Sequence, residues 1–147
     1  LHRMIKDLRP PILDDLGLLS AIRWYAGNRL EALGIQTRVE VTGEERKLSP
    51  PIEIALFRVV QEAINNIGKH AEAHSAVLSV EFKDKSIMIE IEDDGLGFDV
   101  STVSLIPDKA QGVGLLGMKE RIALLGRTFN IESKPGQGTH ITAEVPL

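Results

Sequence analysis

One stretch of the sequence carries side chains whose types and spacing suit a metal ion beside a phosphate. Glu62, Asn66, Lys69 and His70 follow one another at intervals of four, three and one residues, and helical positions three and four apart share a face. Mg²⁺ prefers oxygen ligands, keeps several waters and takes further ligands from substrate phosphates. Asn66 can therefore supply one ligand, Glu62 can hold a coordinated water and Lys69 can meet phosphate as a point charge. The alternative is a polar helix face without a ligand.

Two glycine-containing motifs offer a second kind of chemistry. Asp93, Gly95 and Gly97 come directly after an alternating apolar segment. Glycine permits close backbone approach to a ligand, and a carboxylate at a strand end can accept a hydrogen bond from an amino group such as that of adenine. Gly112 and Gly114 precede a helical pattern, and N–H groups at a helix start favour phosphate. Each motif alone is also explained by an ordinary glycine-rich turn.

Hydrophobic periodicity indicates the helices that must position these residues. We expect one helix to begin with a cap at Asp14 or Asp15 and to end at Gly34. A second should begin at the N-cap Ser49, followed by two prolines, and run to about His70. A third follows residue 114. In the second helix the apolar side chains that should face a core are Ile52, Leu56, Val59, Val60, Ala63, Ile64 and Ile67.

Alternation of apolar and polar residues predicts about five strands, near residues 37–41, 78–82, 87–92, 131 and 141–145. The late strands are joined by short turns, which makes them antiparallel. With three main helices, this pattern predicts an α/β two-layer sandwich in which the helices lie on one face of a mixed sheet. About 15 residues after Asp99 lack a period, and a loop of that length is usually functional, often a lid.

Composition excludes several other classes of protein. The chain has 147 residues, a formal charge of -4 and no cysteine, which rules out disulfides, cysteine-rich zinc sites, thiolate nucleophiles and iron–sulfur clusters. Its second half carries the excess of acidic residues, so broad nucleic-acid binding is not expected. No apolar run reaches the roughly 20 residues of a membrane span, and we expect a cytoplasmic domain. The first residue is leucine, which suggests a piece of a longer protein.

The order of these motifs resembles the ATP-binding domain of the GHKL superfamily over roughly residues 35–147. That superfamily includes sensor histidine kinases, type II topoisomerases, Hsp90 and MutL. Three segments are similar to the nitrate-sensor and DesK-like group of histidine kinases: the N box around Glu62 and Asn66, the Leu8-Arg9-Pro10 segment with residues 13–18, and the glycine motif of residues 112–121. The resemblance implies the Bergerat fold, with ATP held between helices and a lid.

The resemblance also implies roles for single residues. Asn66 would ligate Mg²⁺ with help from Glu62, Lys69 would contact phosphate and His70 would lie near the nucleotide. The lid would cover the phosphates together with Gly112, Gly114 and Leu115.

At the other end of the nucleotide, Asp93 would receive the adenine amino group. Gly95 and Gly97 would shape that pocket, and Thr139 would support the adenine side.

The implied function is that of the catalytic domain of a two-component sensor histidine kinase. Residues 1–15 would be the end of a dimerisation helix and a linker, and residues 16–147 the GHKL ATP-binding domain. The domain would donate the ATP γ-phosphate to a histidine on a dimerisation domain absent from this chain, in a homodimeric parent that serves a response regulator. His2 lies too close to Arg9 to be that histidine. The fragment would be monomeric, would bind no nucleic acid and would not phosphorylate itself.

Two alternatives remain open on the sequence alone. One is a stand-alone GHKL ATPase or an anti-sigma-type serine kinase, in which Glu62 orients a water or a hydroxyl group. The other is a non-catalytic module that senses nucleotide. Two residues depart from the family pattern: Gly68 stands where a bulkier apolar residue is usual, and Arg127 stands where a second glycine is frequent. His74 and His140 are interpreted as incidental.

Overall fold

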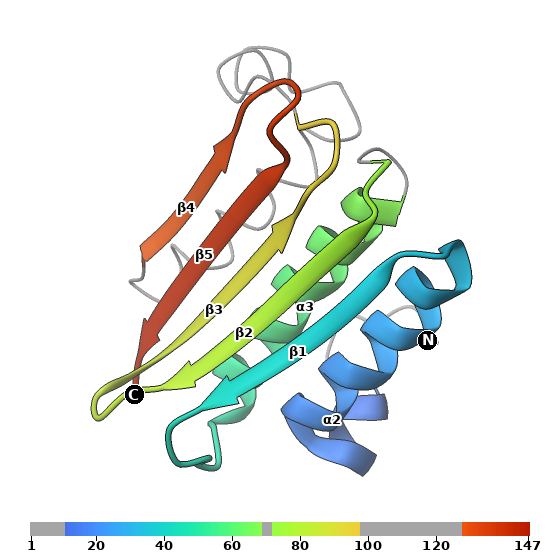
Figure 1. Ribbon diagram of the computed structural model, residues 1–147. Coiled ribbons are helices and arrows are strands. Elements are labelled where there is room, and N and C mark those ends of the chain that lie inside the picture. Colours follow the sequence, from blue (N-terminus) through green and yellow to red (C-terminus); the bar gives the residue numbers. More distant parts are fainter. Residues whose placement is uncertain (1–10, 69–71, 98–127) are drawn as a thin grey trace, which may run out of the picture.

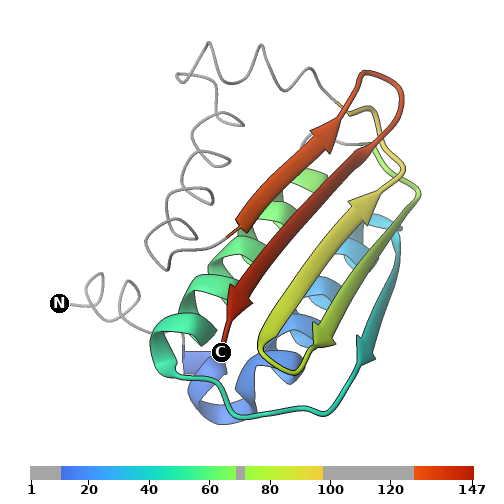
Figure 2. The same ribbon diagram turned by 90° about the vertical axis from the view of Figure 1, so that its left-hand side faces the viewer.

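The computed structural model describes residues 11–68, 72–97 and 128–147, which form two helices on one face of a five-stranded sheet (Figures 1 and 2). The predicted α/β two-layer sandwich is therefore confirmed. The third predicted helix and the predicted lid lie outside the described residues. In chain order the elements are α2 (Pro11–Leu30), the short 3₁₀ turn η1 (Glu31–Leu33), β1 (Gln36–Thr42), α3 (Pro50–Asn66), β2 (Ser75–Phe82), β3 (Ser86–Asp93), β4 (Thr128–Ser133) and β5 (Thr139–Pro146).

The sheet is mixed, with the strand order β1-β2-β3-β5-β4. β1 and β2 are parallel, and the other neighbouring pairs are antiparallel. Parallel neighbours need a crossover connection, and α3 supplies it between β1 and β2 (Figure 1). The C-terminal end of α3 must therefore lie at the end of the sheet where β2 begins. The short hairpins β2–β3 and β4–β5 bring the end of β3 and the start of β5 to the same place.

The two faces of the sheet differ in polarity because side chains alternate along each strand. The face under the helices is apolar, and the opposite face carries glutamates from β2, β3 and β5. The predicted alternation of the strands is confirmed. The buried strand residues are Ala76, Leu78, Val80, Phe82, Ile87, Ile89, Ile91, Ile141, Ala143 and Val145.

Helix α3 is buried on two sides, whereas its hydrophobic periodicity predicts only one. The expected apolar stripe is buried from Leu56 to Ile67, and Ile52 is half-buried. Phe57 lies outside that stripe yet is completely buried, because α2 packs against this side of α3. Ser49 holds the predicted N-cap position with extended backbone (φ -66°, ψ 148°), although its hydroxyl makes no capping hydrogen bond to the described helix. The α-helix runs to Asn66, Ile67 and Gly68 continue it in a π-helical turn, and the predicted end near His70 lies outside the described residues.

The predicted start of the preceding helix is wrong. α2 begins at Pro11 and is divided at Gly17 into two helices, so the helix that carries Leu19 begins after Gly17 and not after Asp14 or Asp15. Proline suits the first helical position because its φ is already close to the helical value. The helix is instead interrupted at Gly17, whose backbone (φ 78°, ψ 173°) is not helical. No helix in the described part of the chain is long and apolar enough to cross a membrane.

The end of this first helical segment explains one departure from the family pattern. Gly34 ends the segment in a left-handed conformation, as predicted, and its N–H donates to the Glu31 carbonyl at 3.0 Å. The chain tightens into η1 before that point, which turns Leu33 outward to 59% exposure. A Cβ atom on Gly68 would lie 3.2 Å from Leu33 Cδ1. Glycine at position 68 thus leaves room for Leu33.

Candidate functional site

A cavity of about 450 Å³ opens at the end of the sheet where β3 ends and β5 begins. Asp93 pairs with Thr139 across β3 and β5, and Thr139 pairs with Ser133 across β5 and β4. These three polar side chains lie on the face of the sheet that the helices cover, directly after its last apolar residues. The residues that line the cavity are Glu92, Asp93, Ile131, Glu132, Ser133, Lys134, Gln137, Gly138, Thr139 and His140.

Asp93 is the only buried ionisable side chain among the described residues, with 8% of its surface exposed. Burial raises the pKa of this carboxyl, and the nearby charges of Asp94 and Glu92 raise it further. The Gly95 N–H opposes them by donating to Asp93 Oδ1 at 2.8 Å. Oδ2 has no hydrogen bond within the described part of the chain. A buried carboxylate that lines a cavity in this way is typical of a ligand-binding residue.

The loop after β3 packs closely against the β4–β5 turn. Gly136 donates its N–H to the Leu96 carbonyl at 2.5 Å. Gly97 (φ 66°) and Gly138 (φ 74°) both adopt conformations that other residues rarely adopt. A Cβ on Gly97 would overlap a backbone carbonyl of the turn, and one on Gly138 would overlap the carbonyl of Asp93. These glycines let two backbones approach beside the carboxylate.

Asp94 fastens the strand end that carries Asp93, a role that its sequence context does not predict. Its Oδ1 accepts the N–H groups of His74 at 2.8 Å and Ser75 at 3.0 Å, and its Oδ2 accepts the Ser75 hydroxyl at 3.0 Å. The Ser75 and His74 N–H groups hold the pKa of Asp94 below its usual range. The end of β3 is thereby tied to the start of β2. In the sequence, the only feature that could have indicated this role is the pair of aspartates directly after an alternating strand.

Hydroxyl groups line the cavity beside Asp93. The Ser133 hydroxyl donates to the Gly138 carbonyl at 2.9 Å, and its oxygen lies 3.0 Å from Thr139 Oγ1. Thr139, predicted on the adenine side, lies next to Asp93. Ser133 was not predicted, because a serine in an alternating strand carries no signal of its own.

Glu62 and Asn66 lie at the same end of the sheet as this cavity. Both are half-buried on α3, and β2 begins at Ser75, only nine residues after Asn66. Since β2 starts beside the end of β3, the end of α3 and Asp93 share one end and one face of the sheet (Figure 1). The fold thus brings the predicted oxygen donors and the predicted base-binding residues to one region. The other predicted site residues lie outside the described residues: Lys69, His70, Gly112, Gly114 and Leu115.

The donor set on α3 suits a hard cation that brings other ligands with it. Among the described residues no group of three or more His, Asp or Glu side chains is close enough to hold a metal. Glu62 and Asn66 offer two oxygen-bearing side chains one helical turn apart. Mg²⁺ bound with substrate phosphates needs only one or two protein ligands. These residues therefore fit a magnesium–nucleotide complex rather than a free metal site.

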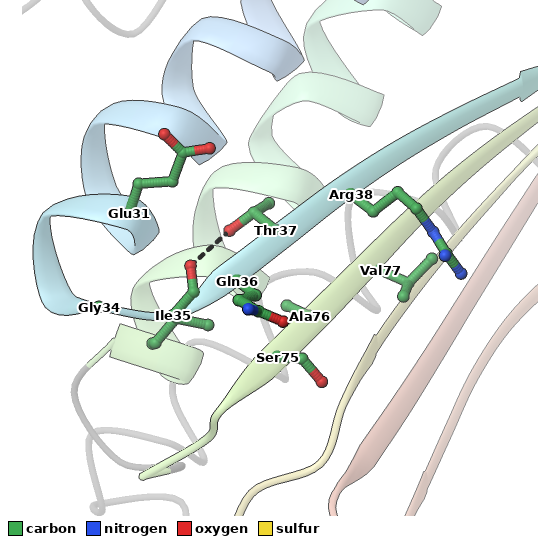
Figure 3. Close-up of a pocket in the computed structure, with 9 residues that line it drawn as sticks. All are labelled: Glu31, Gly34, Ile35, Gln36, Thr37, Arg38, Ser75, Ala76 and Val77. Carbon is green, nitrogen blue, oxygen red and sulfur yellow. Dashed lines mark hydrogen bonds between the residues drawn. The ribbon is translucent and has the colours of Figure 1, made fainter.

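A larger hollow, of about 730 Å³, lies at the start of β1 and β2 (Figure 3). Its charged groups are Glu31 and Arg38, and the Arg38 guanidinium pairs with Glu40 at 3.0 Å. The Thr37 hydroxyl on its wall donates to the Ile35 carbonyl at 3.2 Å. Its lining contains no buried ionisable group among the described residues. The smaller cavity beside Asp93 is therefore the stronger candidate site.

Several known proteins are similar to this chain in sequence. Residues 52–147 match the family of histidine kinase-, DNA gyrase B- and HSP90-like ATPases. The signal transduction histidine-protein kinase/phosphatase DegS of Bacillus subtilis is 41% identical over 95% of the chain, and the oxygen sensor histidine kinase NreB of Staphylococcus carnosus is 36% identical over 96%. The chain spans 36% and 40% of the lengths of these two curated relatives.

Solved structures show the same fold at lower identity. Full-length ShkA in complex with AMPPNP matches 86% of this chain and 29% of its own, with a TM-score of 0.70 and 23% identity. The histidine kinase domain of a blue-light activated kinase from Erythrobacter litoralis matches 87% of this chain and 60% of its own, with a TM-score of 0.59 and 20% identity. Together with the match of residues 52–147, these findings confirm the GHKL resemblance: the chain belongs to the family of histidine kinase-, DNA gyrase B- and HSP90-like ATPases.

Proposed function

We propose that the chain is the ATP–Mg²⁺-binding catalytic domain of a sensor histidine kinase, which passes the γ-phosphate of ATP to a histidine on a dimerisation domain outside this sequence. The observation that carries the proposal is the position of Asp93. It is a buried carboxylate that lines a cavity, at the same end of the sheet as the oxygen donors of α3. The kinase names of the curated relatives support the same proposal.

The cavity beside Asp93 would hold the adenine base. Oδ2 of the carboxylate would accept a hydrogen bond from the adenine amino group, since Oδ1 is already bonded to the Gly95 N–H. Thr139 would border the same edge of the base, and Gly97 would keep the loop after β3 clear of it. A cavity of about 450 Å³ lies within the usual range for small-molecule sites.

The end of α3 would hold the phosphates through the bound cation. Asn66 would be a direct ligand of Mg²⁺, and Glu62 would hold one of its waters. Lys69 would contact phosphate and His70 would lie near the nucleotide. When bound, Mg²⁺ neutralises phosphate charge. The predicted lid would complete the phosphate end of the site with Gly112, Gly114 and Leu115.

Transfer would need little covalent chemistry from this chain. A nitrogen of the acceptor imidazole bonds to the γ-phosphorus while the bond from that phosphorus to the bridging oxygen breaks, and ADP leaves with the electron pair. Catalysis then depends on positioning and on charge neutralisation. Asp93 and Asn66 hold opposite ends of the nucleotide, and so fix the direction in which the γ-phosphate is presented.

The acceptor and the remaining partners would lie elsewhere in the parent protein. We place the end of a dimerisation helix and a linker in residues 1–15, and the break at Gly17 supports a boundary near this point. The parent would be a homodimer that serves a response regulator. Because ATP is a cytoplasmic substrate, the domain would act in the cytoplasm, whether or not the parent is anchored in a membrane.

Binding and transfer should be tested separately. Calorimetry should show that the chain binds ATP in the presence of Mg²⁺, and that Asp93→Asn weakens this binding. Labelled ATP should then transfer phosphate to the histidine of a dimerisation domain supplied in trans, and Asn66→Asp should reduce the transfer. Label retained by the chain alone would contradict the proposal, and release of inorganic phosphate without acceptor would indicate an ATPase. Binding without any transfer to the supplied domain would indicate a nucleotide-sensing module.

A further inference from the structure

Three side chains join α2 to the last turn of α3. The Tyr25 hydroxyl donates to Asn65 Oδ1 at 3.0 Å, and the Arg29 guanidinium donates to the same oxygen at 2.7 Å. The Arg29 guanidinium carbon also lies 5.6 Å from the centre of the Tyr25 ring. Asparagine is a poor helix former in such a position. Its amide oxygen is satisfied here by two donors from a neighbouring helix, one of them charged.

The Tyr25 ring is itself held in place by the core. It packs edge-on against Phe57, with ring centres 5.9 Å apart and planes at 76°. Phe57 is completely buried on α3, eight residues before Asn65. Tyr25 therefore contacts α3 at two levels, through its ring near the middle of the helix and through its hydroxyl near the end.

Asn65 lies between the side of α3 that carries Phe57 and the side that carries the proposed metal-binding residues, about 60° around the helix from Glu62. At about 100° per residue, Asn66 is about 180° around the helix from Phe57, and Asn65 is about 100° from Asn66. The oxygen of Asn65 can stay between its two donors only if the last turn of α3 keeps its rotation. That rotation also determines where Asn66 and Glu62 point.

We propose that Tyr25, Arg29 and Asn65 are positioning residues that orient the metal-binding end of α3 through its contact with α2. The inference rests on the proposed function, because it assumes that Asn66 and Glu62 hold the magnesium–phosphate end of ATP. The base is held independently by Asp93, which lies on β3 and contacts none of the three residues. Loss of the contact should therefore weaken binding only where binding depends on the metal.

The test compares ATP affinity with saturating Mg²⁺ and with EDTA, measured by calorimetry on the whole chain. Tyr25→Phe removes the hydroxyl but keeps the ring against Phe57, and Asn65→Ala removes the shared acceptor. Each should lower the affinity for Mg²⁺–ATP by about tenfold, as expected when residues behind a metal ligand are removed. The affinity in EDTA should stay within about twofold of that of the wild type, because the base-binding residues are untouched.

A matched control is available on the open face of the sheet. Asn130 is an exposed asparagine of β4 whose amide donates to Glu132 at 3.1 Å, and Asn130→Ala should change neither affinity. In an Asn66→Ala background, Tyr25→Phe should cause no further loss, because its effect acts through Asn66. If Asn65→Ala does not fold, Arg29→Gln replaces it in the comparison of ATP affinity with Mg²⁺ and with EDTA.

The outcomes separate this inference from the proposed function. If the wild type does not bind Mg²⁺–ATP, the proposed function fails. If the wild type binds but both variants keep full metal-dependent affinity, the positioning role is wrong. Equal losses with and without Mg²⁺, together with a lower melting temperature, would show that the three residues serve only to join the two helices.

Discussion

Ser133 and Thr139 face each other across the β4–β5 pairing, with their hydroxyl oxygens 3.0 Å apart. Ser133 also lies 2.9 Å from the Gly138 carbonyl, which can only accept, and when Ser133 donates to that carbonyl, Thr139 supplies the proton between the two hydroxyls. In that arrangement Thr139 offers lone pairs to the cavity. The neighbouring Asp93 carboxylate also accepts when it is ionised. In the proposed site, this edge of the cavity would suit the amino group of adenine and oppose the carbonyl group of guanine.

The first prediction concerns base selectivity. Ser133→Ala should free the Thr139 hydroxyl to rotate and donate, so the preference for ATP over GTP should fall by about fivefold, the value of one neutral hydrogen bond. Competition of ATP and GTP against a fluorescent nucleotide measures this ratio. Ser86→Ala is the matched control, because that hydroxyl bonds to Glu144 at the other end of β3. An unchanged ratio in Ser133→Ala would show that Ser133 does not orient Thr139.

The second prediction separates binding from stability at Asp93. Asp93→Asn should weaken ATP binding by roughly 10- to 100-fold, because it removes a charged acceptor. The raised pKa of Asp93 means that the folded protein binds this proton more tightly than the unfolded chain does. Stability is then greatest below the ordinary value of 3.8 and falls as the pH rises through the folded-state pKa.

Asparagine cannot ionise, so the variant escapes that loss. Its melting temperature relative to that of the wild type should be higher at pH 7 than at pH 4. Thermal melts at the two pH values measure this difference. A variant that loses stability relative to the wild type as the pH rises would contradict a raised pKa at Asp93.

The third prediction concerns the carboxylate of Asp94. Asp94→Ala removes three hydrogen bonds that tie β3 to β2, and should lower the free energy of unfolding by about 1–2 kcal/mol, since the site is exposed. Because the pKa of Asp94 is lowered, its carboxylate stabilises the folded protein above pH 3.8, the ordinary pKa of aspartate. This stabilisation is lost as the pH falls through the folded-state pKa.

Denaturant titrations at pH 7 and in acid should therefore show that the difference in unfolding free energy between the wild type and Asp94→Ala disappears in acid. Asp94→Asn keeps an acceptor for the two N–H groups and should lose less than Asp94→Ala. Asp84→Ala, in the β2–β3 hairpin, serves as the control. A difference that persists at the lowest pH would show that these hydrogen bonds do not depend on the charge.

The fourth prediction compares two glycines of the same turn. Gly136 and Gly138 both have positive φ, but a Cβ on Gly136 meets nothing within 4 Å, whereas one on Gly138 would overlap the Asp93 carbonyl. Gly136→Ala should cost about 1 kcal/mol of unfolding free energy, from backbone strain alone. Gly138→Ala should cost clearly more and should also weaken ATP binding, because β3 and the turn must separate. Equal losses in the two variants would contradict the close approach at Asp93.

Much of the site could be predicted because its signals are local. Glu62 and Asn66 are one helical turn apart, and Asp93 with its two glycines follows directly on a strand, so their types and spacing are visible in a short window. Thr139 was placed by its resemblance to the family, and the structure puts it beside Asp93. Roles for Lys69 and for the glycine motif of residues 112–114 stay predictions.

The residues that were missed depend on partners far along the chain. Asn65 bonds to Tyr25 and Arg29, which are 40 and 36 positions away. No periodicity within α3 can show that α2 covers Phe57, and helical spacing alone groups Asn65 with the ligand-facing residues. The start of α2 was predicted wrongly for a related reason: both Asp14 and Asp15 are good caps by type, yet the break falls at Gly17.

The strands, the apolar stripe of α3 and the order of the motifs can be predicted from the sequence, because alternation and helical spacing record which side of each element is buried. The sequence also indicates the family, since several motifs occur in the required order. The packing of the elements brings Asn65 to α2, places Ser133 beside Thr139 and lets Asp94 tie β3 to β2. Those relationships arise where separate elements meet, and the sequence does not specify which elements pack together.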